Sequence, residues 1–114
     1  MHTPAEFRDV VRRGLRMGRP TLIVHAGRSL GDDVRVGFVV SKTVGNAVTR
    51  NLVKRRLRHL TVAVLARTPP GTRVVVRALP RAATHPNEVS RDLDQAWAKA
   101  MQRLIERRLP RARS

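Results

Sequence analysis

A run of cationic side chains between positions 50 and 58 has the clearest capacity for chemistry in this sequence. Guanidinium groups form paired hydrogen bonds with phosphate oxygens, and an amide side chain can bind a base edge or a sugar. A solvated helix face usually mixes both signs of charge, whereas this run contains no acidic residue. We therefore interpret it as a binding surface for nucleic acid in preference to an ordinary solvated face. Its polar members are Arg50, Asn51, Lys54, Arg55, Arg56 and Arg58.

Side chains that could break bonds are not arranged for that purpose. A protein nuclease usually needs a general base and a general acid, or paired carboxylates that hold a metal. The 4 His, at positions 2, 25, 59 and 85, have no metal-ligand spacing, and no acidic residue pairs with a His at a convincing spacing. The absence of Cys excludes thiol nucleophiles and thiolate-bound zinc. We predict no catalytic residue and no metal site in the polypeptide.

Length and charge restrict the class of protein. A chain of 114 residues forms one domain with a modest core, which excludes a large enclosed active site. The net charge of +16 and the pI near 12.0 favour nucleic acid or an anionic membrane surface as partner. No apolar run approaches the length of about 18 residues typical of a membrane span, and no signal-peptide pattern opens the chain. We expect a cytoplasmic protein.

A helix must carry the cationic run. Val53, Leu57, Leu60 and Val64 fall at i, i+4, i+7 and i+11, the pattern of a helix packed on a core. Asn51, Lys54, Arg55 and Arg58 then lie on the opposite side of the helix, and Arg50 and Arg56 flank that side. Gly45 suits a tight loop between a preceding strand and this helix.

The remaining elements follow from local patterns. Thr3 to Glu6 is a capping box, which predicts a helix from Pro4 with Leu15 among its apolar face residues. Alternation and β-branched residues predict strands over 21–26, 34–41 and 72–79, and the second, apolar on both faces, is expected to be central. An apolar stripe through Trp97 predicts a last helix over 87–109.

These elements predict an α/β two-layer sandwich in the order αββαβα. A single domain spans residues 1–109, and a short basic tail covers 110–114. The strands before and after the middle helix are expected to be parallel neighbours in a βαβ unit, for which general topology favours a right-handed crossover.

Three segments also resemble a known family. The run Arg-Val-Gly-Phe-Val-Val-Ser-Lys at 35–42, followed by Gly-Asn-Ala-Val-x-Arg-Asn-x-x-Lys-Arg at 45–55, resembles the signature of the protein subunit of bacterial ribonuclease P. Glu-Phe-Arg-Asp-Val-Val-Arg-Arg-Gly at 6–14 is similar to the first helix of that family, so the resemblance covers nearly the whole chain. One position departs from the pattern, because Leu52 stands where the family usually has Arg. An expected RNA contact is then missing, and Arg55 or Arg56 would substitute for it.

The resemblance implies a fold like domain 2 of ribosomal protein S5, with a left-handed crossover. It implies an accessory subunit of an endoribonuclease whose catalyst is the RNA subunit, with Mg²⁺ used mainly by the RNA. Lys42 and the polar residues of the cationic run would bind the ribozyme. The implied partners are the ribonuclease P RNA and precursor tRNA, without a membrane or an obligate protein partner.

The same resemblance places the 5′ leader of precursor tRNA in a cleft between the first helix and the sheet. Phe7 and Val11 would line it, although spacing alone makes Phe7 a typical core residue. Ile23 and His25 share the cleft side of their strand, where His25 could stack on a base, donate to a phosphate or simply be a surface residue. We therefore expect a shallow groove of Phe7, Val11, Ile23 and His25.

Two alternatives stay open at this stage. A ribosomal protein that packs rRNA, with no role in tRNA processing, would have the same size and charge. A stand-alone nuclease would need catalytic groups that the sequence does not offer in a recognisable arrangement. A ribosomal protein should gain no affinity from the 5′ leader of precursor tRNA, which distinguishes the first alternative from a ribonuclease P subunit. Cleavage of precursor tRNA without an RNA subunit would support the second alternative.

Overall fold

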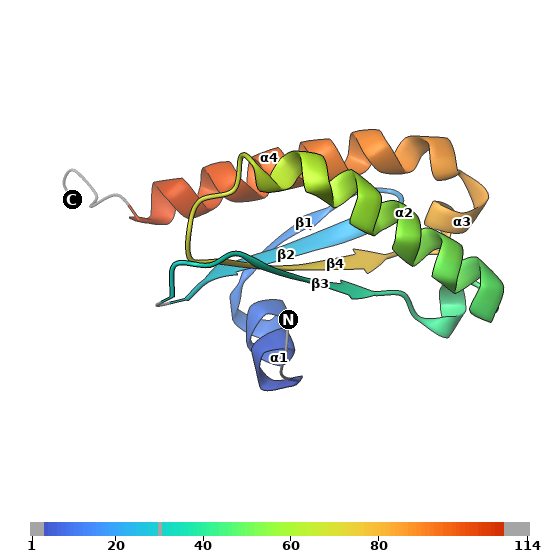
Figure 1. Cartoon of the computed structure of the whole chain (residues 1–114), viewed down its shortest axis with the longest axis horizontal. Coiled ribbons are helices and arrows are strands. Elements are labelled where there is room, and N and C mark those ends of the chain that lie inside the picture. The colour runs from blue at the N-terminus through green and yellow to red at the C-terminus, as the bar shows by residue number, and fades with distance from the viewer. Residues whose placement is uncertain (1–3, 30, 109–114) are drawn as a thin grey trace.

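The computed structural model describes residues 4–29 and 31–108, in which helices cover both faces of a four-stranded sheet (Figure 1). Two long helices, α2 and α4, lie side by side on one face, and α1 lies on the other. The elements are α1 (Pro4–Arg13), β1 (Leu15–Gly18), β2 (Leu22–Arg28), β3 (Arg35–Val39), α2 (Ala47–Leu65), β4 (Thr72–Ala78), α3 (Arg81–Thr84) and α4 (Val89–Arg108). Short 3₁₀ turns occupy Lys42–Val44 and Pro86–Glu88. This mixed α/β architecture confirms the predicted fold class, but the order αββαβα is corrected to αβββαβαα, because β1 and α3 were not predicted.

The order of the strands in the sheet is β1-β2-β4-β3. β4 runs antiparallel to β2 and parallel to β3, so the predicted parallel βαβ pair is confirmed. The prediction that the strand over 34–41 is central is wrong, because β3 lies at the edge of the sheet. β4 takes the central place, and its Val74, Val75 and Val76 are fully buried between β2 and β3. The handedness of the crossover stays a prediction of the family resemblance.

The sequence analysis missed β1 and extended the first helix too far. α1 ends at Arg13, and Gly14 follows at a close approach to β2, where an added Cβ would lie 2.4 Å from the carbonyl oxygen of Ala26. Leu15 leaves the helix, pairs with Ala26 in the sheet and is buried in the main core. A strand of four residues has too little alternation to be distinguished from the end of a helix.

The main core lies between the sheet and the pair α2 and α4. Every second residue of β2, namely Leu22, Val24 and Ala26, faces this core. The predicted stripe of α4 is confirmed: Val89, Leu93, Ala96, Trp97, Ala100, Met101 and Leu104 are all buried. The indole N–H of Trp97 donates to the Thr68 hydroxyl at 2.8 Å, which ties α4 to the segment after α2.

A buried carboxylate fixes the start of α4 to the sheet. Asp92 has no exposed surface and accepts hydrogen bonds from the Thr21 amide at 3.1 Å and the Thr21 hydroxyl at 2.7 Å. The Nε of Arg19 lies 3.5 Å from the other carboxylate oxygen. Burial acts to raise the pKa of Asp92, but the hydrogen bonds from Thr21 and the charge of Arg19 outweigh it and lower the pKa below its ordinary value.

The effect of Asp92 on stability should depend on pH. A carboxyl whose pKa is lower in the folded than in the unfolded chain stabilises the fold above the unfolded value, and this contribution is lost as the pH falls through the folded value. We expect Asp92→Asn to lower the free energy of unfolding at neutral pH by about 1 to 3 kcal/mol. The difference in the free energy of unfolding between this variant and the native chain should become smaller in acid. Denaturant unfolding at several pH values measures the loss of stability and its dependence on pH. Asp32→Asn in the exposed loop is the control. A difference in stability between Asp92→Asn and the native chain that does not change with pH would contradict the charged role of Asp92.

Candidate nucleic-acid interface

The start of α2 is set by the loop before it. Asn46 caps the helix, and its side-chain oxygen accepts a hydrogen bond from the Thr49 amide at 2.9 Å. Gly45 lies directly before the cap, where an added Cβ would be only 2.8 Å from Cγ2 of Thr49. The loop therefore needs glycine to bring the chain from β3 into the first turn of α2.

Burial of one stripe determines which side of α2 faces outward. Val53, Leu57 and Val64 are at most 3% exposed, and Leu60 is half-buried. The predicted packing side of the helix is therefore confirmed, and Arg55, Arg56 and Arg58 are exposed on its other side. Exposed members of the predicted set are Lys42, Asn51, Arg55, Arg56 and Arg58, while Arg50 and Lys54 are half-buried. All belong to α2 except Lys42, which lies in the turn that precedes it.

Five carboxylates within residues 4–29 and 31–108 pair with arginines outside α2, among them Asp92, which lies near Arg19. Asp9 lies 3.3 Å from Arg13, Asp94 lies 2.6 Å from Arg67, and Glu88 lies 2.8 Å from Arg81. Asp33 binds both Arg35 at 2.8 Å and Arg73 at 3.1 Å. None of these ion pairs includes a cation of α2. The outward surface of α2 is thus positive without a counter-charge in the described residues, and the buried Nε of Arg50 has no hydrogen-bond partner there.

The opposite face of the sheet carries a second set of polar residues. Arg16 of β1 pairs with His25 of β2, and Ile23 of β2 pairs with Arg77 of β4, so the side chains of all four point to the α1 side. His25 is 3% exposed, and neither of its ring nitrogens has a hydrogen-bond partner among the described residues. Burial, followed by the charges of Arg77 and Arg16, lowers the pKa of His25. Burial and both charges thus disfavour the protonated form of the ring.

The predicted leader-binding residues differ in their exposure. Ile23 is 6% exposed and lies beside His25 on the same face of β2, whereas Val11 of α1 is 36% exposed. The side chain of Phe7 lies outside the described residues, although its backbone belongs to α1. Ile23 and His25 thus form the floor of the α1-side face, and they offer little accessible surface in this conformation.

Two arginines on this face were not nominated from the sequence. Arg16 lies in β1, the strand that the sequence analysis missed. Arg77 is exposed and lies on the α1 side of β4. The alternation of side chains within 72–79 could have predicted this position from the sequence. Both belong to the candidate surface because they flank His25 in the sheet.

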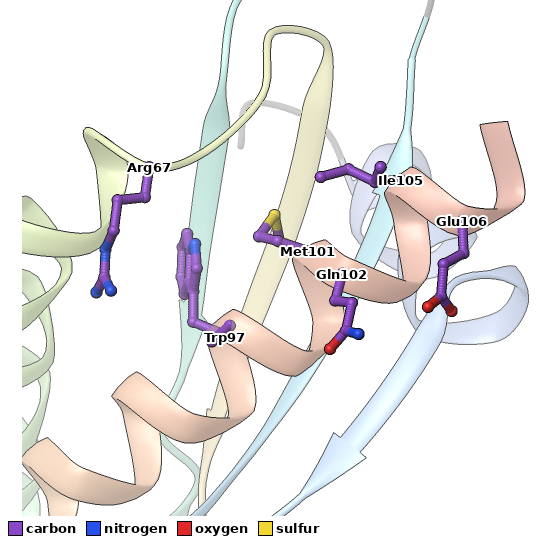
Figure 2. A pocket seen from close by; sticks show the side chains of 7 residues that line it. Arg67, Trp97, Met101, Gln102, Ile105 and Glu106 are labelled. Carbon is purple, nitrogen blue, oxygen red and sulfur yellow. The ribbon is translucent and has the colours of Figure 1, made fainter. Parts of the chain in front are cut away.

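A pocket that the sequence did not predict lies beside the second half of α4 (Figure 2). Its volume is about 340 Å³, and its lining is mainly apolar. Figure 2 shows Arg67 on the α2 side and Trp97 on α4, with Met101 and Ile105 further along α4. Trp97 and Met101 are buried core residues, so the pocket is a gap at the edge of the core, and Arg67, Gln102 and Glu106 supply its polar lining.

The described residues offer no metal centre. They contain no group of three or more His, Asp or Glu side chains that could hold an ion. His59, Ser90 and Asp94 line one hollow between α2 and α4, but the Asp94 carboxylate accepts a hydrogen bond from Arg67 at 2.6 Å and is occupied by it. Across residues 4–29 and 31–108, no helix combines the length and apolar character that a bilayer crossing needs.

Comparison with known proteins gives a consistent match. The family model described as Ribonuclease P matches residues 1–101. A protein of Kocuria rhizophila named "Ribonuclease P protein component" is 53% identical over 104 residues, covering 90% of this chain and 92% of its own. A protein of the same name from Streptomyces bikiniensis is 50% identical over 111 residues, covering 88% of this chain and 86% of its own.

Solved structures share the fold at lower identity. The ribonuclease P protein of Staphylococcus aureus superposes with a TM-score of 0.79 at 24% identity, over 89% of this chain and 95% of its own. That of Thermotoga maritima, in complex with 1-(4-fluorophenyl)-2-thiourea, gives a TM-score of 0.72 at 20% identity, over 90% and 97%.

The environment of His25 can be measured directly. An NMR titration should show that the pKa of His25 lies below the ordinary value for histidine, because burial and two nearby cations disfavour the protonated ring. Arg77→Ala should raise this pKa, since it removes one of those cations. Arg103→Ala on α4 is the matched control and should leave it unchanged. A His25 pKa that does not respond to Arg77→Ala would contradict the electrostatic coupling across β2 and β4.

Proposed function

This chain belongs to the ribonuclease P protein family, and we propose that it binds the catalytic RNA of a bacterial ribonuclease P together with the 5′ leader of precursor tRNA. In this role it assists Mg²⁺-dependent endonucleolytic removal of the leader, which gives the mature tRNA 5′ end. The polypeptide is the accessory subunit, and the RNA is the catalyst. The proposed compartment is the cytoplasm, with no obligate protein partner.

The unbalanced positive surface of α2 carries this proposal. Arg55, Arg56 and Arg58 form no ion pair within the described residues. The phosphates of a folded RNA would give these arginines anionic partners. Neutralising phosphates releases counterions, so affinity from these contacts falls steeply as salt rises. Asn51, exposed among the cations, adds a group that can both donate and accept hydrogen bonds. These contacts fix the orientation of the protein on the ribozyme.

The two faces of the sheet support the binding of two RNA segments at once. α2 and α1 lie on opposite sides of the sheet (Figure 1), so a ribozyme on α2 leaves the α1 side accessible. There Arg16 and Arg77 can bind phosphates of an extended leader, and Val11 offers apolar contact. Aromatic residues make up only 3% of the sequence. Leader binding would therefore depend on contacts with the sugar-phosphate backbone of the RNA more than on base stacking.

The chemistry of cleavage is assigned to the RNA. Mg²⁺ prefers octahedral oxygen ligands, and the described residues contain no carboxylate cluster that fits it. His25 is buried without a hydrogen-bond partner in the described residues, and Asp94 is held by Arg67. The contribution of the polypeptide is therefore binding, orientation and a lower repulsion between two polyanions.

Removal of two α2 cations tests the ribozyme surface. Arg55→Ala combined with Arg58→Ala should weaken assembly with a ribonuclease P RNA by about 1 to 3 kcal/mol and reduce the slope of log affinity against log salt. Filter binding or fluorescence anisotropy across salt concentrations measures both quantities. Lys99→Ala with Arg103→Ala, an equal loss of charge from exposed positions of α4, is the matched control. A salt slope equal to that of the native chain would show that this face of α2 stays in solvent.

The leader-binding role predicts a preference among substrates. The reconstituted holoenzyme should bind precursor tRNA with a 5′ leader more tightly than mature tRNA, and Arg77→Ala should reduce this preference about threefold or more. Arg103→Ala on α4 is the control. If the protein gives no advantage to leader-bearing tRNA, the rRNA-binding alternative is favoured. Protein with Mg²⁺ but without the RNA subunit should leave the precursor intact, and cleavage in that sample would overturn the assignment of catalysis to the RNA.

A further inference from the structure

Three large apolar side chains are exposed on the outward side of α2. Val48 is 69% exposed, Leu52 is 54% exposed and Val62 is 67% exposed. These values contrast with the buried stripe of the same helix, where Val53 and Leu57 are at most 3% exposed. The three exposed residues therefore contribute nothing to the core.

Helical spacing brings the three into one strip. At about 100° per residue, positions 48, 52 and 62 fall within a sector of about 80°. Arg55 and His59 fall in the same sector, Asn51 and Arg58 border it on one side, and Arg56 borders it on the other. The apolar strip thus runs through the middle of the cationic surface rather than beside it.

The surrounding charge determines which partner fits the strip. A second copy of this chain packed through the same surface would bring two sets of guanidinium groups together, and repulsion would oppose it. An ordinary protein partner would need carboxylates at each cation. A folded RNA provides phosphates for the cations and, where bases are unstacked, apolar base and ribose faces for the strip.

Resting on the proposed function, we propose that Val48, Leu52 and Val62 form a contact strip for unstacked nucleobases and riboses of the ribozyme RNA. The strip adds affinity through burial of apolar surface, which monovalent salt does not screen. The cations supply the salt-sensitive part of the affinity, and the strip supplies a part that persists at high salt. Because these side chains have no hydrogen-bonding groups, they recognise an exposed base face and not its identity.

Substitutions at Leu52 distinguish the salt-sensitive part of the affinity from the part that persists at high salt. Leu52→Gln replaces the side chain with a polar one of similar length and helix propensity, and Leu52→Met keeps it apolar. In equilibrium binding of the full-length chain to ribonuclease P RNA over about a tenfold range of salt, Leu52→Gln should weaken binding by about five- to twentyfold at every concentration. Its salt slope should equal that of the native chain, and Leu52→Met should bind nearly as the native chain does.

Two further variants make the experiment decisive. Ile105→Gln changes an apolar residue of α4 that is 46% exposed and should have no effect. Arg55→Ala should reduce both affinity and slope. If Arg55→Ala has this effect but Leu52→Gln binds as the native chain does, the strip proposal is overturned while the proposed function stands.

Other outcomes separate the remaining explanations. If neither Arg55→Ala nor Leu52→Gln changes binding, the assignment of α2 to the ribozyme fails as well. Sedimentation of the free chain tests the second-copy alternative: a dimer that Leu52→Gln dissociates would overturn the RNA contact. Thermal unfolding of each variant should match that of the native chain, because position 52 is outside the core.

Discussion

The packing of α2 against the sheet is the interaction on which the candidate surface depends. Burying Val53, Leu57 and Val64 contributes about 1.5 to 3 kcal/mol for each side chain. This burial holds the cations of the same helix close together on the outward side, where they repel one another. RNA binding would relieve the repulsion and stabilise the folded chain through linkage.

The sheet separates the two candidate surfaces. Alternation along β2 and β4 sends one set of side chains into the core beneath α2 and α4 and the other set toward α1. The Thr21–Asp92 hydrogen bonds and the Trp97–Thr68 hydrogen bond fix α4, and through it the end of α2, to this sheet. The sheet therefore holds the two candidate surfaces on opposite sides of the molecule, as the proposed binding of two RNA segments requires.

Local patterns predicted most of the long elements. The capping box predicted the first residue of α1, and the stripes predicted the buried sides of α2 and α4. The errors occurred where a pattern was short or ambiguous: β1 has only four residues, and the apolar character of β3 on both faces suggested a central strand. Most residues of β3 are in fact half-buried, so apolar character on both faces of a strand does not determine its place in the sheet.

By itself, the sequence determined that α2 would have one apolar and one cationic side, because helical spacing assigns each residue a direction regardless of what the helix packs against. It also determined that Ile23 and His25 share a face of their strand, through the period of two. Only the tertiary structure decided that His25 is buried between Arg16 and Arg77, and that the ion pairs among the described residues include no cation of α2. Burial and ion pairing depend on residues far apart in the chain, and their proximity arises only when strand order and helix packing are set.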